Sequence, residues 1–206
     1  MIILQYIGII GRTDKTKVTF NQEVINVIYK YGYIPLGIIA TIDKNNLENY
    51  LPLIKMCDGF ILQGGTDYYD IDLAITKYLY QNNIPTLGIC LGMQTMAMCF
   101  DGIMKNIKKH KSKKLYVHQI NINKSSKLYN IIKKEKIMVN SRHKSYIEKT
   151  NLKICATNKI IEAIEDDTKN FFIGVQWHPE TLMDENSILL FNSFFKTIKS
   201  QKNEKI

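Results

Sequence analysis

The sequence predicts an α/β fold in which helices cover both faces of a mixed, mostly parallel central sheet. The first apolar run, over residues 2–10, is nearly continuous, as in strands that are buried on both faces. A segment with helical spacing follows it, and strand-like and helix-like segments then alternate as far as residue 89. With 206 residues, 45% of them hydrophobic, we expect residues 1–206 to form a single domain with a substantial core.

The first half of the chain is predicted to form alternating strands and helices. Helical spacing of Val24, Ile25 and Ile28 predicts a helix over residues 22–31. The other expected elements are strands over 34–39, 60–62 and 84–89, and helices over 47–56 and 72–81. Ligands of such sheets bind at the carboxyl ends of the strands, so the segments that follow the last two of these strands are expected to meet at one edge.

The second half of the chain has shorter apolar runs with turn residues between them, which predict antiparallel or mixed strands. Apolar and polar residues alternate over 115–122, a brief strand is expected at 137–139, and 160–165 is expected to pair with 171–176. Residues 186–199 carry apolar side chains at helical spacing, so the last helix is expected to pack on the sheet as part of the core.

Cys90 has the sequence surroundings of a nucleophile. It stands in the segment GICLGMQ, directly after the expected strand 84–89. A strand that turns abruptly into a helix cramps the backbone of the turn residue, and flanking glycines avoid a clash there. The thiol then lies at a helix N-terminus, where unpaired amides and the positive dipole end favour a thiolate and can bind a developing oxyanion. This arrangement indicates acyl transfer.

A base for this nucleophile is expected at His178, in the segment QWHPE after the apolar run 171–175. Pro179 fixes the chain between His178 and Glu180, so the carboxylate can hold one ring nitrogen and leave the other facing Cys90. The sequence therefore predicts a Cys-His-Glu triad whose members meet through the fold. The alternative for His178 is a structural histidine.

Paired glycines follow the third expected strand. Gly64 and Gly65 have bare backbones whose amides can approach a substrate carbonyl, and the amides of Gly65 and Leu91 together can form an oxyanion hole. Gln94 lies one helical turn after Cys90, on the same side of the helix, and can reach the substrate. The alternative for the glycines is an ordinary tight turn.

These three segments, in this order, resemble class I glutamine amidotransferase domains. The segments VNSRH at 139–143 and GVQWHPE at 174–180 make the chain similar to the γ-glutamyl-γ-aminobutyrate hydrolase (peptidase C26) branch of that superfamily. The resemblance implies a flavodoxin-like, class I glutamine amidotransferase-like fold and a hydrolase that requires no cofactor. It also implies that Cys90 forms a thioester with a small γ-glutamyl substrate, which water then cleaves to release glutamate and a free amine.

The resemblance also assigns residues to a substrate pocket. It implies that Asn140, Ser141 and His143 line the pocket for the γ-glutamyl group, with Gly64 beside the substrate carbonyl. Arg142 lies in the same segment and can bind an anionic leaving group. The alternatives for this segment are a simple turn and an exposed arginine.

Two positions depart from the branch and leave two functions open. Many members carry an arginine after the nucleophile, where this chain has Leu91, as in amidotransferase subunits that supply ammonia to a synthase. A second histidine often follows the position of His143, where this chain has Lys144. The chain is thus either a free-standing hydrolase of γ-glutamyl amines or a glutaminase subunit with a separate synthase as its partner. The complete triad disfavours a third possibility, a non-enzymatic interaction module.

The chain has a net charge of +9, and its most basic stretch is the run at residues 105–114. This run lacks interleaved aromatic residues that would stack on bases, and no nucleic-acid motif follows it, so we expect a solvated loop and no nucleic-acid partner. No segment approaches the ~20 apolar residues of a membrane span, so no membrane partner is expected. The sequence leaves open the role of the run and the oligomeric state, including a homo-oligomer.

The N-terminus lacks a basic leader and the four cysteines form no Cys-x-x-Cys pair, so we expect a cytoplasmic protein with Cys57 and Cys99 as buried, reduced thiols. The triad contains the only close histidine–carboxylate pair that the sequence predicts, and no cysteine spacing suits zinc, so no metal site is predicted. His110 and His118 are interpreted as structural histidines.

Overall fold

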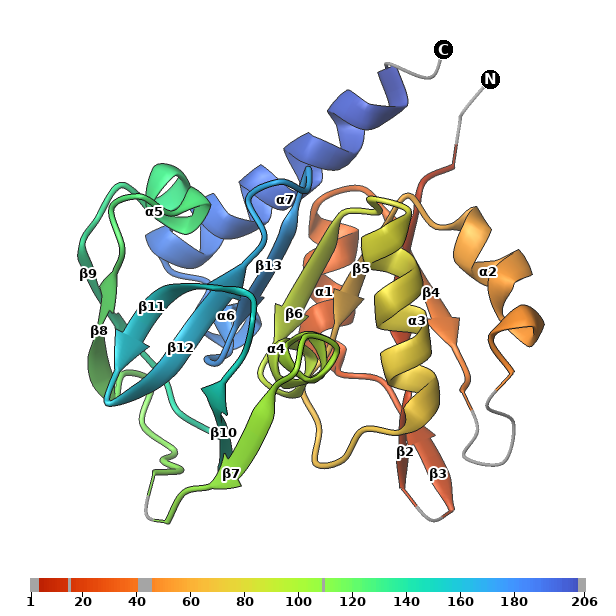
Figure 1. The fold of residues 1–206 in the computed structure, drawn as a ribbon. Helices are drawn as coiled ribbons and strands as arrows, with labels where there is room; N and C mark the ends of the chain where they lie inside the picture. The colour runs from red at the N-terminus through yellow and green to blue at the C-terminus, as the bar shows by residue number, and fades with distance from the viewer. Residues whose placement is uncertain (1–3, 15, 41–45, 109, 204–206) are drawn as a thin grey trace.

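The computed structural model describes residues 4–14, 16–40, 46–108 and 110–203, which form a mixed central sheet flanked by helices (Figure 1). The strands are β1 (Tyr6–Ile10), β2 (Arg12–Asp14), β3 (Lys17–Thr19), β4 (Ile34–Ile38), β5 (Gly59–Leu62), β6 (Thr86–Ile89), β7 (Ile103–Asn106), β8 (His118–Ile122), β9 (Lys136–Val139), β10 (Ser145–Lys149), β11 (Lys153–Asn158), β12 (Ile160–Glu165) and β13 (Phe172–Val175). The helices are α1 (Gln22–Lys30), the 3-10 turn η1 (Leu47–Asn49), α2 (Leu51–Met56), α3 (Asp70–Gln81), α4 (Leu91–Met98), α5 (Lys127–Ile132), α6 (Pro179–Leu182) and α7 (Glu185–Asn203).

The nine-stranded sheet has the order β4-β1-β5-β6-β13-β12-β11-β8-β9. The five strands from β4 to β13 are parallel, and each later pair in this order is antiparallel. The predicted class, a mixed and mostly parallel sheet flanked by helices, is therefore confirmed. The expected pairing of 160–165 with 171–176 is also confirmed, because β12 and β13 are antiparallel partners with Ala163 opposite Val175.

The core lies in two layers, one on each face of the sheet. Successive residues of β1 belong to different layers: Ile9 belongs to the cluster that includes residues of α1, α5 and α7, whereas Ile10 belongs to the cluster that includes residues of α2, α3 and α4. Figure 1 shows α3 and α4 in front of the sheet and α1 and α7 behind it. Since both faces are covered, the parallel strands are apolar on both sides, which explains their nearly continuous hydrophobic runs.

Several boundaries differ from those that the sequence predicts. The first strand begins at Tyr6, and residues 2 and 3 of the predicted strand lie outside the described residues. The predicted helix 47–56 is divided into η1 and α2, with Pro52 in the first turn of α2. Elements of three to six residues were not predicted, namely β2, β3, β7, β10, β11, α5 and α6. They are too short for a periodic pattern, and β7 pairs with the distant β10.

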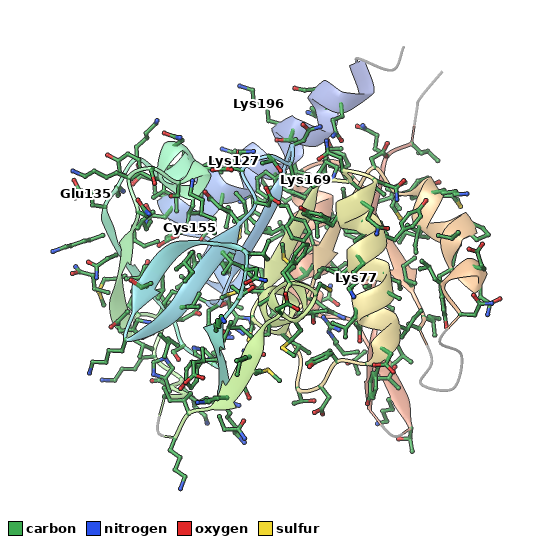
Figure 2. The ribbon with its side chains drawn as sticks, in the orientation of Figure 1. Lys77, Lys127, Glu135, Cys155, Lys169 and Lys196 are labelled. Atoms are coloured by element: carbon green, nitrogen blue, oxygen red, sulfur yellow. The ribbon has the colours of Figure 1, made fainter. Side chains whose placement is uncertain are left out.

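The positive charge is spread over the surface. Lys77 on α3, Lys127 at the start of α5 and Lys196 on α7 lie on separate elements (Figure 2), and α3 and α7 cover opposite faces of the sheet. Lys109, within the basic run 105–114, lies outside the described residues. Within the described part of the chain, no helix combines the length and the apolar composition that crossing a membrane requires.

Candidate active site

Cys90 lies at the sharp turn between β6 and α4, with φ 54° and ψ −103°. Residues with a side chain rarely adopt a positive φ, and such strain concentrates at functional sites. The turn is held on both sides, because the Cys90 N–H donates to Val175 O of β13 at 2.8 Å and Cys90 O accepts from Gln94 N at 3.1 Å. The predicted strand–nucleophile–helix turn is therefore present.

Helix α4 packs unusually close to the strands beneath it. A Cβ atom added to Gly92 would lie 1.9 Å from Leu62 O of β5, and one added to Gly88 of β6 would lie 2.4 Å from Met96 Sδ. Glycine at these two positions lets the backbone of α4 approach the sheet directly. The flanking glycines thus fix the position of the helix whose N-terminus carries Cys90.

His178 and Glu180 come to Cys90 from the end of β13. His178 Nδ1 lies 2.7 Å from Glu180 Oε1, and His178 lines the same cavity as Cys90. Since Nδ1 faces Glu180, Nε2 is the atom left for Cys90. The side chain of His178 is 12% exposed and that of Glu180 is fully buried. The structure therefore brings together the three residues that the sequence predicted as a triad.

The electrostatics of this group favour a protonated His178. Burial lowers the pKa of His178, but the hydrogen bonds and charges of Cys90 and Glu180 outweigh burial and raise it from 6.5 to about 10. An imidazolium at this position can pair with a Cys90 thiolate and later give its proton to a leaving group.

Replacing Glu180 by glutamine is expected to lower the pKa of His178. Glutamine can still accept a hydrogen bond from Nδ1 but lacks the negative charge that stabilises the imidazolium. In an NMR titration of the histidine ring, wild-type His178 should lose its second proton near pH 10 and the variant at a lower pH. An unchanged titration would mean that Glu180 does not hold the charge state of His178.

Asn140 supports His178 from behind. Its Oδ1 accepts from His178 N at 2.8 Å, and its Nδ2 donates to His178 O at 3.0 Å and to Thr181 Oγ1 at 3.1 Å. Ser141 Oγ donates to His110 O at 2.9 Å. Asn140 and Ser141 are both 0% exposed, and neither lines the cavity at Cys90. These two predicted substrate contacts are therefore absent from the cavity lining, and their side chains are bonded to neighbouring backbone groups and Thr181.

Replacing Asn140 by alanine is expected to lower kcat by about 10- to 100-fold with little change in KM, since a displacement of the base by about 1 Å is that costly. The change removes two hydrogen bonds to the backbone of His178 and one to the side chain of Thr181. Steady-state kinetics of glutamate release would measure the effect. Ser141→Ala is the matched control, because Ser141 is equally buried but is bonded to His110. A raised KM with unchanged kcat in Asn140→Ala would instead assign Asn140 to substrate binding.

A cavity of about 410 Å³ opens above Cys90. Its lining residues are Gly65, Thr66, Cys90, Gln94, Asn106, Lys111, Arg142, His143, Lys144, Ser145 and His178. Of the predicted site residues, Gly65, Gln94, Arg142 and His143 therefore lie at the cavity. Lys111, Arg142 and Lys144 are exposed, so the lining of this cavity carries three positive charges.

Gly64 is placed beside the base. A Cβ atom at Gly64 would lie 2.9 Å from Cε1 of His178 and 3.6 Å from Cβ of Cys90, so the absence of a side chain leaves room for the ring. Leu91 is 1% exposed, and its side chain packs under Gly65. The amides of Gly65 and Leu91 are the predicted oxyanion donors, and these two residues are neighbours in the structure.

Gln63 anchors the loop that carries Gly64 and Gly65, and no local motif in the sequence indicates this role. Gln63 Nε2 donates to Ile10 O at 2.9 Å and to Thr19 O at 3.0 Å, while Gln63 Oε1 accepts from Asn21 N at 2.6 Å. This buried amide joins the end of β5 to β1, to β3 and to the start of α1. It thereby fixes the direction in which the two glycines leave the sheet.

Arg12 and Asp72 form a second anchor for the same loop. Arg12 donates to Gln63 O from Nη2 at 2.7 Å and from Nε at 3.2 Å, and its Nη1 lies 2.9 Å from Asp72 Oδ1. Asp72 Oδ2 also accepts from Tyr69 N at 2.8 Å and so caps α3. No motif signals these contacts in the sequence, because Arg12 and Asp72 meet only through tertiary packing.

Gln94 and Gln176 form a buried amide pair next to the nucleophile. Gln94 Nε2 donates to Ser145 O at 2.9 Å and to Gln176 Oε1 at 3.0 Å, and Gln176 Nε2 lies 3.6 Å from Cys90 Sγ. Gln94 lines the cavity, as predicted, but its amide nitrogen is already engaged. Gln176 was missed, although it stands in the same short segment as His178.

His143 lines the cavity, and His118 begins the antiparallel strand β8. His143 Nδ1 lies 2.9 Å from Ser145 O, and burial lowers the pKa of His143 to about 4, so the ring is neutral. His118 Nε2 lies 2.8 Å from Glu162 Oε1. The expectation that His178 and Glu180 form the only close histidine–carboxylate pair is therefore wrong, because β8 and β12 bring His118 and Glu162 together from distant parts of the sequence.

The other cysteines have different surroundings from Cys90. Cys57 and Cys155 are buried, as expected for Cys57, whereas Cys99 is only partly buried. Burial raises the pKa of Cys57 and of Cys99 to about 12, and it also raises the pKa of Cys155. These three thiols are therefore held in the neutral form, while Cys90 shares its cavity with His178, whose pKa is raised.

Comparison with known proteins finds a matching family model and relatives that include GMP synthases. The model of the family Peptidase C26 matches residues 69–180. GMP synthase [glutamine-hydrolyzing] of Francisella tularensis subsp. holarctica (strain FTNF002-00 / FTA) is 32% identical over 145 residues, which are 68% of this chain and 27% of that protein. The same enzyme of Francisella tularensis subsp. tularensis (strain WY96-3418) is 32% identical over 168 residues, or 79% of this chain and 32% of that protein. The chain thus matches about a third or less of these relatives' length.

Two solved structures share the fold. A putative GMP synthase subunit from Thermoplasma acidophilum superposes with a TM-score of 0.75 and 18% identity, covering 100% of this chain and 99% of the other. The glutaminase domain of Trypanosoma brucei CTPS, solved with bound acivicin, superposes with a TM-score of 0.71 and 18% identity, covering 95% and 94%. At this identity the likeness establishes the architecture alone.

Proposed function

The chain belongs to the peptidase C26 family, within the class I glutamine amidotransferase-like superfamily, and from this membership we propose that it hydrolyses a γ-glutamyl amide bond. The observation that carries the proposal is Cys90 at a strained turn, at the same cavity as a histidine that Glu180 holds through Nδ1. A nucleophile, a base and a residue that orients the base are the parts that acyl transfer requires.

In the first half of the proposed reaction, the Cys90 thiolate attacks the γ-carbonyl carbon of the substrate. The carbonyl oxygen becomes an oxyanion, which the amides of Gly65 and Leu91 stabilise. The C–N bond then breaks as His178 gives its Nε2 proton to the departing amine, which leaves as the free amine or as ammonia. The γ-glutamyl group remains on Cys90 as a thioester.

In the second half, a water molecule takes the place of the amine. Neutral His178 accepts a proton from this water as the oxygen attacks the thioester carbonyl, and Glu180 stabilises the imidazolium that forms. Collapse of the second tetrahedral intermediate breaks the C–S bond, so glutamate is released and the thiolate–imidazolium pair is restored. The proposed reaction draws only on the side chains and amides of the chain itself.

The first candidate substrate is a γ-glutamyl amine whose amine portion carries a carboxylate. Lys111, Arg142 and Lys144 line the same cavity as Cys90, and Arg142 presents a planar donor group that suits a carboxylate. The family match supports this candidate as well. In this form the chain is a free-standing hydrolase.

The second candidate substrate is glutamine, with the released ammonia passed to a separate synthase. Two observations favour it: the GMP synthases that match this chain are glutamine-hydrolysing, and Leu91 follows the nucleophile as in ammonia-supplying subunits. A putative GMP synthase subunit shares the fold, which is compatible with action beside a synthase partner.

Glutamate release by the isolated protein distinguishes the two candidates. Glutamine, γ-glutamyl conjugates of carboxylate-bearing amines and conjugates of neutral amines would be compared, with Cys90→Ala as the blank. Rapid turnover of the acidic conjugates, lost on replacing Arg142 by glutamine, would establish the free-standing hydrolase. Slow turnover of glutamine alone would indicate a glutaminase that awaits a synthase. Absence of Cys90-dependent release from every substrate would reject the proposed chemistry.

A further inference from the structure

A second group of potential ligand atoms lies next to His143, which lines the catalytic cavity. His110 precedes β8, His118 begins β8, and Glu162 lies on β12; one ligand atom from each residue lies within 4.8 Å of the other two. The His110 and His118 ring centroids are 5.1 Å apart, and the His118 Nε2 to Glu162 Oε1 distance is 2.8 Å. The residues come from separate parts of the sequence, so only the fold creates this group.

Two of these side chains have buried polar atoms without partners. His110 Nε2 and Glu162 Oε2 make no hydrogen bond to any part of the chain that the structure describes. Glu162 is 0% exposed. Leaving a buried polar atom unpaired is unfavourable, and more so for a charged group. The hydrogen bond from His118 satisfies one carboxylate oxygen and leaves the other, together with the His110 nitrogen, without a bonding partner.

We propose that His110, His118 and Glu162 bind a divalent transition-metal ion, with Zn²⁺ as the best fit. Two imidazoles and one carboxylate form a ligand set typical of zinc sites that keep a fourth position open. Magnesium and calcium prefer sites built from oxygen ligands, so the two imidazoles disfavour them. This site is separate from the Cys90 chemistry, and either proposal can fail without the other.

The distances suit this assignment. Metal–ligand distances of about 2.0–2.2 Å place tetrahedral ligand atoms about 3.4 Å apart. The pair at 2.8 Å would open slightly, and an atom at up to 4.8 Å would move closer by up to about 1.4 Å. His110 precedes β8 in a connecting segment, so its ring can adjust, while His118 and Glu162 are fixed on strands of the sheet.

The surroundings hold the ligands and leave an access route. Ser141 Oγ donates to His110 O at 2.9 Å, and Glu162 O accepts from Gln176 N at 2.7 Å, so the backbones of two ligands are anchored. His110 also lines a cavity of about 470 Å³ through which an ion can arrive from solvent. The three lysines around this cavity are exposed, so solvent screens their repulsion of a cation. They are Lys108, Lys111 and Lys144.

The test is a competition titration of Zn²⁺ between a chromogenic chelator and the whole Cys90→Ala chain, in which the competing thiolate is removed. We expect a single tightly bound ion per chain. Glu162→Gln should weaken binding by about 100-fold or more, because it removes the charged ligand but keeps a hydrogen-bonding partner for His118. Cobalt(II) should give the visible absorption of a four-coordinate ion, and this absorption should be lost in the same variant.

Two further variants make the result decisive. His110→Gln changes a residue in a connecting segment, so it tests the site even if Glu162→Gln fails to fold, and it should also weaken binding. His178→Gln changes the other histidine–carboxylate pair and should leave zinc affinity unchanged. Zinc binding that survives both His110→Gln and Glu162→Gln would overturn the assignment, as would the absence of binding to folded Cys90→Ala protein.

Discussion

Replacement of Cys90 by alanine is expected to lower the rate of glutamate release by at least ~10⁴-fold, because the proposed thioester cannot form without the sulfur. The fold should survive this change. Alanine keeps the Cβ atom, so it keeps the conformational strain at φ 54° and removes only the thiol. Rates measured at saturating substrate, together with a thermal melt of each protein, would separate lost chemistry from lost structure.

Cys90→Gly tests whether the backbone of this turn is strained. Glycine adopts positive φ without a steric penalty, so this variant should be inactive but more stable than Cys90→Ala by about 1 kcal/mol. Urea denaturation of the two variants would measure the difference. Equal stabilities would argue against strain at this position, and residual glutamate release by either variant would point to another nucleophile.

Replacement of Gly92 by alanine is expected to destabilise the protein by about 3 kcal/mol or more, a large share of the total stability of a typical domain. The added Cβ atom would lie 1.9 Å from Leu62 O and 2.6 Å from Leu62 C, and both are backbone atoms of β5 that cannot rotate away. Helix α4 would have to move off the sheet. Cys90 stands immediately before this helix, so activity should fall together with stability.

Gly32→Ala is the matched control for this prediction. Gly32 has φ 80°, and an added Cβ atom would meet no atom within 4 Å, so only the positive φ is costly there, by about 1–2 kcal/mol. The free energy of unfolding from urea denaturation would compare the two variants. If Gly92→Ala costs no more than Gly32→Ala, the close contact between α4 and β5 is not what stabilises the turn.

The close approach of α4 explains how the sheet positions the nucleophile. Leu62 lies opposite Gly88 on adjacent parallel strands, and Val175 lies opposite Ile89 on the other side. The strands that end there are followed by the paired glycines, Cys90 and the segment that contains His178. Because the carboxyl ends of parallel strands lie at the same edge of the sheet, three segments that are distant in the sequence lie close together at this edge.

The candidate triad could be proposed from the sequence because its signals are local. Flanking glycines mark the turn at Cys90, and Pro179 sets the spacing between His178 and Glu180. The segment around Asn140 was recognised as part of the site, but its contact with the backbone of His178 was not. A family motif indicates that a residue is near the chemistry; it does not indicate whether the side chain faces the substrate or the protein.

The sequence by itself determined the α/β class, the main strands and helices, and which residues could serve as nucleophile, base and orienting carboxylate, because these follow from patterns within about twenty residues. Only the tertiary structure decided which side chains share one small volume. Gln176 reaches Cys90, Arg12 reaches Asp72, and His118 reaches Glu162 across long stretches of chain. Such contacts depend on strand order and register, which bring distant residues together without leaving a local pattern.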